Sequence, residues 1–425
     1  SLVVLAACLI GVGLSGCRPA GIKQPGGAAS ALREIPSVRL AFRYEPDVPA
    51  PADPNPQASG DALYPPVRAD FDGNRSADLL ARTIVSPNSK RVLVAYRRIG
   101  DAENTFRLDM YADDGKFIRR VSPDSMAVDF LDSIVWSPDS STVAFVAITR
   151  TGGGGSLTTP VANTNSNANT TPGEGNSNTT VAETPEPEVS GTPEPPAPPN
   201  VLTFRTEQIY LCSSDGTDVK PITQTENLIY YYFVWSPDGS MLAALASRLD
   251  EWRYLMAVSA QNGEKFVPAG RPRIIEKNGR ERTLDDAWTK VKPVWSPDSS
   301  KVAVAFDKPI QIRVYDAVGT APTQAAIPLR NPLLISSQAY DRAKQSQTDP
   351  NSNVAPVIDA NANVDVTALP DEKTLVSFQP IVLLNWATED NIYFQTGYVR
   401  EFENSSEDLF SSLRWHRLIL SGQGK

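Results

Sequence analysis

Short apolar runs separated by polar turns recur along this chain in one fixed form. A run ending in Val-Trp is followed by Ser-Pro-Asp-(Ser or Gly) and then by a second run rich in Val and Ala, at residues 135–146, 234–245 and 294–305. A weaker copy at 84–95 carries Val in place of Trp, and a degraded copy occupies 384–394. Self-similarity of this kind predicts an array of identical supersecondary units.

Each copy has the pattern of a strand, a turn and a second strand. Proline presets φ for a turn, and Ser and Asp side chains can hydrogen-bond to nearby backbone amides. The second run is apolar enough to be buried on both faces. A catalytic group is needed once, whereas a turn cap is needed in every turn, so we interpret the aspartates as turn caps and the tryptophans as packing residues. The structural motif residues are Trp136, Pro138, Asp139, Trp235, Pro237, Asp238, Trp295, Pro297, Asp298 and Trp386.

The repeat length predicts four short strands per unit. Without the polar stretch at 151–200, the spacing of the copies is about fifty residues, as in a β-propeller blade. We therefore predict an all-β chain with five to six four-stranded blades in one domain at 37–425. The Trp-Ser-Pro-Asp motif and its following strand resemble the WD40-like repeats of TolB-type propellers, and also those of prolyl-oligopeptidase-type peptidases. The resemblance covers about 80–425.

Several segments depart from the repeat. Residues 151–200 lack large apolar side chains and are predicted to be a disordered insertion within the second blade. Residues 336–374 form a second polar insertion, with helical character near 338–345. In the third blade we predict outer strands at 254–258 and 265–267, followed by a charged connection at 271–292. An alternating segment at 37–44 predicts a strand that could help to complete a ring.

The chain opens with an apolar run that ends in Leu14-Ser15-Gly16-Cys17. The run is short for a membrane span and closes on small residues, which is typical of a secretory signal at 1–16, truncated at its start. The last four residues resemble the lipobox of bacterial lipoproteins, and this resemblance implies lipidation of Cys17 and a flexible tether at 17–36. Because Arg18 is not the Asp that retains such lipoproteins in the inner membrane, we expect a periplasm-facing, lipid-anchored protein of the cell envelope, at the outer membrane if the cell is Gram-negative.

One acidic segment resembles the short calcium loops of integrin-type propeller repeats. Its oxygen-bearing side chains are Asp70, Asp72, Asn74 and Asp78, and oxygen ligands suit a hard cation. Arg75 stands where such loops usually have Gly, which puts the resemblance in doubt. A plain acidic turn and a calcium site, the one cofactor considered, both remain open.

The composition limits the partners and the kinds of catalytic or metal site that this chain can have. A net charge of −9 and a pI of about 4.9 disfavour nucleic acid and anionic membrane surfaces as partners. The chain has one histidine, His416, and no nucleophile elbow, and His/Cys zinc clusters are excluded by composition. After signal cleavage Cys212 is the remaining free thiol, and we expect it to be buried. Carboxylate pairs for glycoside chemistry stay open.

Two classes of function follow from these patterns. The first is a non-enzymatic, monomeric scaffold or adaptor that binds envelope proteins of unknown identity and meets the membrane only through its lipid. Partner contacts would come from irregular connections such as 97–104 and 248–253, or from the aromatic cluster Tyr230, Tyr231 and Tyr232, for which blade-edge packing is the alternative. The second is a propeller enzyme, either a glycosidase or lyase or the propeller portion of a truncated prolyl-oligopeptidase-type peptidase. A calcium-dependent adhesion module using 70–78 is a third possibility.

Overall fold

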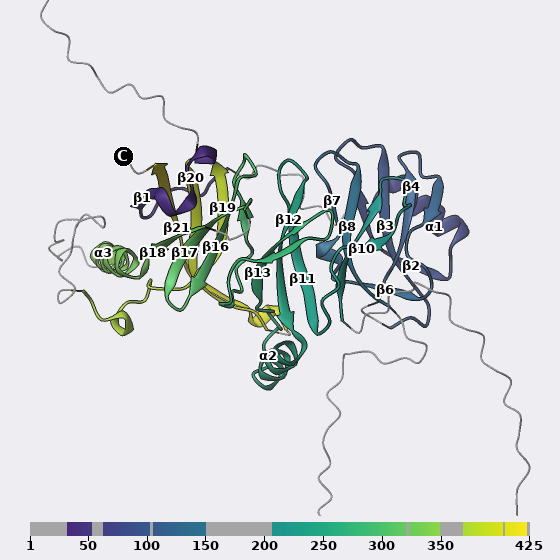
Figure 1. Ribbon diagram of the computed structural model, residues 1–425. Helices are drawn as coiled ribbons and strands as arrows, with labels where there is room; N and C mark the ends of the chain where they lie inside the picture. Colours follow the sequence, from purple (N-terminus) through teal and green to yellow (C-terminus); the bar gives the residue numbers. More distant parts are fainter. Residues whose placement is uncertain are drawn as a thin grey trace, which may run out of the picture.

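Five antiparallel β-sheets, one for each copy of the repeat, make up the described chain (Figure 1). The computed structural model describes residues 32–52, 63–102, 105–149, 206–319, 323–348, 369–402 and 404–422. The predicted signal, the Cys17 lipobox, most of the tether and the predicted insertion at 151–200 lie outside these residues. Mostly β structure in four-stranded sheets agrees with the propeller-like fold predicted from the repeats.

The first two sheets follow the predicted hairpin pattern. The first sheet contains β2 (Asp78–Val85), β3 (Arg91–Arg98), β4 (Arg107–Ala112) and β5 (Phe117–Arg120), paired in that order. The second contains β6 (Met126–Asp129), β7 (Val135–Trp136), β8 (Thr142–Thr149), β9 (Gln208–Ser213) and β10 (Lys220–Pro221). Both β6 and β7 pair with β8 and are separated by a short 3-10 helix, so the first strand of this sheet is interrupted.

The third and fourth sheets each hold four strands paired in sequence order. The third contains β11 (Leu228–Trp235), β12 (Met241–Arg248), β13 (Arg271–Glu276) and β14 (Glu281–Thr283). The fourth contains β15 (Val294–Trp295), β16 (Lys301–Asp307), β17 (Ile310–Asp316) and β18 (Gln324–Pro328).

The fifth sheet joins the two ends of the described chain. Its strands are β19 (Ile381–Thr388), β20 (Asn391–Arg400), β21 (Leu409–Gly422) and β1 (Leu40–Glu45). The N-terminal strand pairs antiparallel with the last one, with Leu40 opposite Gly422 and Glu45 opposite Arg417. The strand predicted at 37–44 is therefore present at 40–45, after a 3-10 helix at Ser37–Arg39, and it supplies the fourth strand of the last sheet.

In the described ranges, three α-helices accompany the sheets: α1 (Pro65–Asn74), α2 (Leu249–Gln261) and α3 (Arg330–Thr348). The first of these packs on the outer face of the first sheet through Val67 and Phe71, which are one helical turn apart and buried against β3 and β4. Among the described helices, none combines the length and the hydrophobicity that a membrane crossing requires.

Apolar side chains between consecutive sheets form the core. One cluster joins the first and second sheets through residues such as Leu93 and Phe145, and others join the second to the third, the third to the fourth and the fourth to the fifth. The second strand of each inner sheet is buried on both faces, as in β12 and β16. This explains the runs of Val and Ala that follow every turn, because a strand between two sheets has no solvent face.

The array is open between its first and fifth sheets. Among the described residues, none of the five hydrophobic clusters combines these two sheets, and the outer face of the first sheet is covered by α1 instead. Leu79 and Val85 on β2 are exposed, as expected for a strand without a neighbouring sheet on that side. The ring closure considered from the repeats is therefore not seen in the described residues.

The third sheet corrects the sequence-based assignment of its outer strands. Residues 249–261, where one strand was predicted, form α2, and the outer strands β13 and β14 lie in the predicted charged connection. Good helix formers such as Leu, Met and Ala dominate the segment, and the Glu251 carboxylate accepts a bond from the Arg248 amide at the first turn. The five consecutive apolar residues at 254–258 were too short a run to separate strand from helix.

Candidate functional site

The repeated turns place the motif aspartates in structural roles. In the second, third and fourth sheets the motif Ser hydroxyl donates to the Asp carboxylate at 2.5–2.6 Å, and the same carboxylate accepts the amide two residues further on at 3.0 Å. The hydrogen bond from Ser137 is the main reason why the pKa of Asp139 is lowered to about 2. Each motif carboxylate therefore accepts hydrogen bonds from its own turn.

The motif tryptophans connect each sheet to the preceding one. The indole N–H of Trp136 donates to the carbonyl of Ile84 at 3.0 Å, and the next two motif indoles donate to the carbonyls of Val135 and Val234 at 3.4 and 3.1 Å. In every case the acceptor lies one residue before the motif position of the previous sheet. Trp386 differs, because its indole donates to the carbonyl of Glu389 in its own turn. All four rings are buried.

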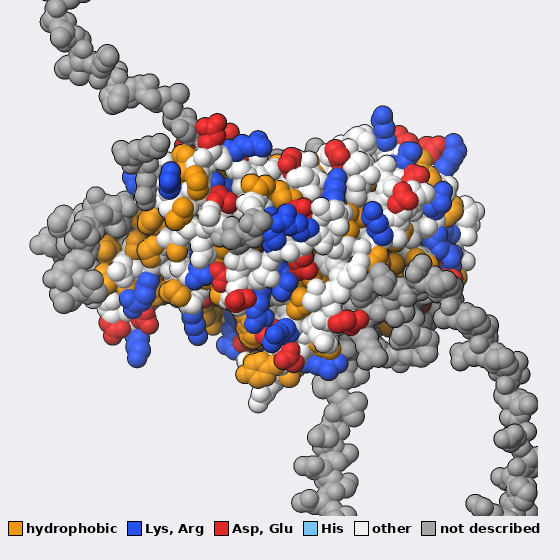
Figure 2. All heavy atoms as spheres, viewed as in Figure 1, with side chains coloured by type: hydrophobic (Ala, Val, Ile, Leu, Met, Phe, Trp, Pro, Cys, Tyr) orange, Lys and Arg blue, Asp and Glu red, His pale blue; other side chains and the backbone are white. Residues whose placement is uncertain are grey.

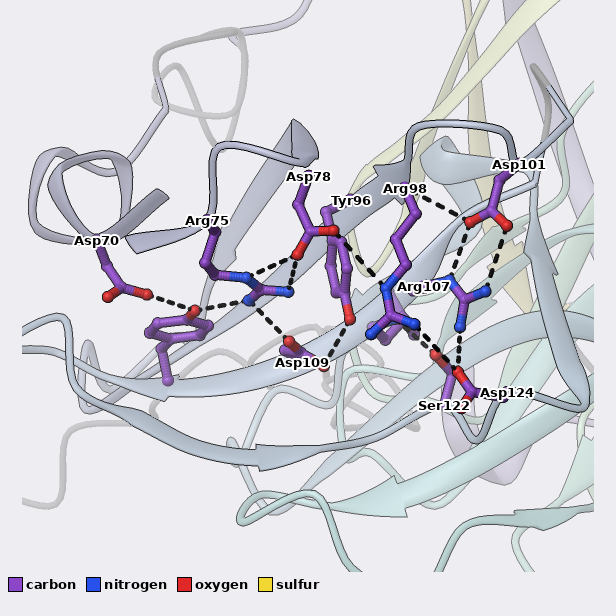
Figure 3. A network of polar contacts seen from close by, with 12 residues as sticks. Asp70, Arg75, Asp78, Tyr96, Arg98, Asp101, Arg107, Asp109, Ser122 and Asp124 are labelled. Atoms are coloured by element: carbon purple, nitrogen blue, oxygen red, sulfur yellow. Dashed lines mark hydrogen bonds and ion pairs between the residues drawn. The ribbon is translucent and has the colours of Figure 1, made fainter. Parts of the chain in front are cut away.

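A buried polar network holds α1 against the first sheet (Figure 3). The guanidinium of Arg75 lies over the rings of Phe71 and Tyr96, 4.2 Å from each centroid, and the two rings themselves meet edge to face. Its nitrogens pair with Asp78 and Asp109 at 2.8 Å. The bonded partners keep the pKa of Arg75 above its ordinary value although burial opposes this, while burial raises the pKa of Asp109. We treat Arg75 and Asp109 as an ion pair, because the guanidinium stays charged in proteins and lies 2.8 Å from this carboxylate.

The network extends on both sides of this guanidinium. Arg75 also donates to the hydroxyl of Tyr111 at 2.8 Å, and that hydroxyl donates to Asp70 at 2.8 Å. On the other side, Arg107 is bound by Asp101 and by Asp124 (Figure 3). The charged and hydroxyl groups of this network thus bond to one another.

The four residues of the possible calcium loop lie on α1 and at the start of β2 rather than in an open loop. Asn74 donates to Asp70 at 2.8 Å, Asp72 pairs with Arg68, and Asp78 pairs with Arg75. Within the described ranges, no group of three or more His, Cys, Asp or Glu side chains is placed to hold a metal ion. Calcium binding by this segment stays a prediction; in the structure Asp78 is paired with Arg75 and Asp72 with Arg68.

The aromatic cluster predicted as a partner contact lies on β11. Tyr230 is fully buried and donates to Glu281 at 2.8 Å, and Tyr231 is buried against Trp252 with ring centroids 5.5 Å apart. Tyr232 is half-buried below the ammonium group of Lys292. Tyr230 and Tyr231 are therefore packing residues, which is the alternative that the sequence left open, because their side chains are buried.

His416 lies in the core between the fifth sheet and α3. Its Nδ1 is 2.9 Å from the Tyr44 hydroxyl, its Nε2 is 2.9 Å from the Thr396 hydroxyl, and its ring stacks on Phe394. Burial lowers the pKa of His416 to about 3. Cys212 is also buried, and burial raises the pKa of its thiol to about 12. Both side chains are inaccessible to a substrate. At neutral pH the thiol is not ionised, as a nucleophile requires, and the imidazole is too weak a base for general-base chemistry.

His416 predicts a specific pH dependence. The fold favours the neutral ring, so its contribution is intact above the unfolded pKa of about 6.5 and is lost as pH falls below it, at about 1.4 kcal/mol per unit. At pH 4.5 the loss is about 3 kcal/mol. Denaturant titration of the parent and of His416→Gln at pH 7 and 4.5 measures it: the stability gap between the two should shrink by that amount. An unchanged gap would contradict the assignment.

Exposed apolar side chains gather at one end of the sheets. They come from α2, the loop after it and the tips of β20 and β21, and we call this set the apolar rim: Tyr254, Val258, Val267, Tyr398, Val399, Leu409, Phe410 and Leu413. The loop and the hairpin are joined by a bridge between Glu264 and Phe402 and by a hydrogen bond from the Lys265 amide to the Glu401 carbonyl. Hydrophobic side chains are visible over α2 at the lower edge in Figure 2.

Charges beside the apolar rim neutralise one another. Arg400 pairs with Glu264, and Lys265 pairs with Glu401 at 3.8 Å. The described chain begins at the other end of the sheets, where Ile35 contacts Gly422 (Figure 1). Sequence reasoning missed this rim, because it is assembled from segments about 140 residues apart that only the fold brings together.

One cavity of about 530 Å³ lies beside the β16–β17 hairpin. Two carboxylates, Asp307 and Glu372, line it together with basic and apolar residues. Glu372 is already paired with Arg330 at 2.9 Å. Asp307 and Glu372 are therefore the two carboxylates at which the glycoside chemistry left open by the sequence can be tested.

Comparison with known proteins gives structural likeness at low similarity. No protein-family model and no curated protein match the chain. Similar solved structures include an oligogalacturonate lyase in complex with manganese (11% identity, TM-score 0.33, covering 80% of this chain and 64% of the lyase) and a TolB-like protein from Agrobacterium tumefaciens (11%, 0.33, 82% and 91%). A third is prolyl oligopeptidase B from Galerina marginata (11%, 0.39, 89% and 44%).

The chain spans less than two thirds of the length of the lyase and of the peptidase. The neighbours include two kinds of enzyme and a TolB-like protein, and at these scores they carry no argument about activity.

Proposed function

We propose that this chain is a non-enzymatic, protein-binding scaffold of the cell envelope, held at the membrane through a lipid on Cys17. The observation that carries the proposal is the contrast between its polar and apolar groups. The groups most suited to chemistry are engaged or buried, namely the motif aspartates, His416 and Cys212, whereas apolar side chains stand exposed together in the apolar rim. Exposed apolar surface of this kind is typical of protein contacts.

The repeat architecture supports the same function. Every inner sheet is buried on both faces, so the array offers a rigid body whose variable parts are its connections. Rigid scaffolds of stacked units commonly present their binding surfaces on such connections. The acidic net charge of −9 argues against nucleic acid as the partner.

Crosslinking in intact envelopes followed by purification of the tagged chain tests the proposal. We expect one envelope protein to be enriched with the parent and to be reduced with Cys17→Ala, which removes the acceptor of the lipid but leaves the sheets unchanged. Enrichment of nothing above background, together with turnover of a glycan or peptide that Asp307→Asn abolishes, would replace the scaffold with the enzyme alternative.

A further inference from the structure

The hairpin of β20 and β21 extends beyond the rest of the fifth sheet. On one side, β19 reaches β20 only as far as Thr396. On the other side, β1 pairs with residues 417–422 of β21; beyond it, the Val48 amide donates to the Trp415 carbonyl and Asp47 pairs with Arg414. Residues 398–400 and 409–411 therefore form a two-stranded ribbon, with Val399 opposite Phe410.

The two edges of this ribbon differ. The β20 side continues into residues 401–402, which are held by the loop after α2. Along β21, residues 409–413 are exposed apart from Ser412. On the side away from β20, no described strand pairs with them. Ser412, with φ of 54°, bulges out of the ladder, so the regular part of the edge is 409–411.

The side chains of this edge lack the charges and prolines that protect many edge strands, and the bulge at Ser412 restricts regular pairing to 409–411. Natural edge strands carry Lys, Pro or inward-pointing charges, which discourage pairing with another chain. Residues 409–413 read Leu-Phe-Ser-Ser-Leu, without a charge or a proline. Leu409, Phe410 and Leu413 are each about half exposed. A free edge with apolar side chains provides both main-chain hydrogen bonds and pockets for alternating side chains.

We propose that the β21 edge at 409–413 binds an extended, uncharged, apolar segment of a partner protein by strand addition. The inference rests on the proposed scaffold function and specifies how its partner is held. The basic side chains Arg400 and Lys265 beside the edge are already paired with Glu264 and Glu401, so the bound segment needs no acidic group to neutralise them. A second copy is disfavoured because each copy carries a charge of −9. A lipid surface is disfavoured because the described chain, which would lead to the lipid anchor, starts at the other end of the sheets.

A synthetic peptide tests the mode of binding on the full chain. The probe is a peptide of alternating Val and Thr, about seven residues long, and its control is the same peptide N-methylated at alternate residues. We expect the plain peptide to slow amide exchange at 409–411 and the N-methylated one to bind at least about tenfold more weakly, because it cannot donate the main-chain bonds. Equal binding of the two peptides would overturn strand addition.

Substitutions locate the site. Phe410→Lys and Leu409→Lys place a charge on the edge and should each weaken peptide binding at least about tenfold. Both side chains are exposed, so circular dichroism should be unchanged. Val318→Lys is the matched control, at an exposed apolar residue outside the apolar rim, and should leave binding unchanged. Parent-like binding by both edge variants would overturn the proposal.

Two further outcomes separate this inference from the proposed function. If the envelope partner is still enriched by Phe410→Lys, the scaffold function stands and the edge is not its site. If no partner is enriched with the parent, the function fails even where the peptide binds. Dimers in sedimentation that Phe410→Lys dissolves, or flotation with phosphatidylglycerol vesicles, would overturn the proposal in favour of a second copy or a lipid.

Discussion

Replacing Arg75 by Met lowers the free energy of unfolding by about 3–5 kcal/mol. The substitution keeps most of the apolar stem but leaves Asp109, whose side chain is 3% exposed, without its cation. It also removes the cation that lies over the rings of Phe71 and Tyr96. Denaturant unfolding measures the loss, and amide exchange should rise along β3, since α1 is held to the first sheet partly by this guanidinium.

Two variants give this prediction its controls. Arg68→Met removes an ion pair with Asp72 on the same helix, where both partners are more than half exposed, and should cost less than about 1 kcal/mol. Adding Asp109→Asn to Arg75→Met should restore part of the loss, because the unpaired buried charge is then gone. Equal effects of the Arg68 and Arg75 variants would mean that the network contributes no more than a surface pair.

Trp235→Ala should destabilise the protein by about 3–5 kcal/mol. The ring is 6% exposed, belongs to the cluster between the second and third sheets, and donates its indole N–H to Val135. Because stability in a repeat array depends on the contacts between neighbouring units, a cavity at this junction should also split unfolding into separate steps. Calorimetry would show a second transition that the parent lacks.

A smaller change at the same position separates packing from hydrogen bonding. Trp235→Phe keeps an aromatic ring in the cluster but loses the indole N–H, and we expect it to cost less than half as much as Trp235→Ala. Trp288→Ala is the matched control, because Trp288 is 41% exposed and lies outside the repeated motif. A loss at Trp288 as large as that at Trp235 would remove the special role assigned to the motif ring.

Local chemistry explains why the repeated turns could be located from sequence. Ser137, Pro138 and Asp139 close their turn with side chains only two residues apart, and the positive φ of Ser140 is imposed within the same four residues. Interactions of such short range can be predicted directly from the sequence. The same holds for the apolar runs of β8, β12 and β16, which show burial on both faces by having no polar alternation.

Other elements were ambiguous because their partners are distant in sequence. The segment at 70–78 has the oxygen-rich pattern of a metal loop, but residues 70–74 form the end of α1, which begins with two prolines and packs on the first sheet through two apolar residues one turn apart. Arg75 then reaches Asp109, 34 residues away, and this pairing cannot be read from either segment alone. The α2 segment was mistaken for a strand for a similar reason, because tertiary contacts decide short apolar runs.

By itself, the sequence located five copies of the repeated turn and predicted the burial of the strands that follow, since these depend on residues within a few positions of one another, but it left the number of blades at five to six. Only the tertiary structure decided that β1 completes the last sheet, that α1 covers the outer face of the first, and that the tips of β20 and β21 meet the loop after α2. Those contacts join segments up to several hundred residues apart, and their stability comes from surfaces that exist only once the sheets have formed.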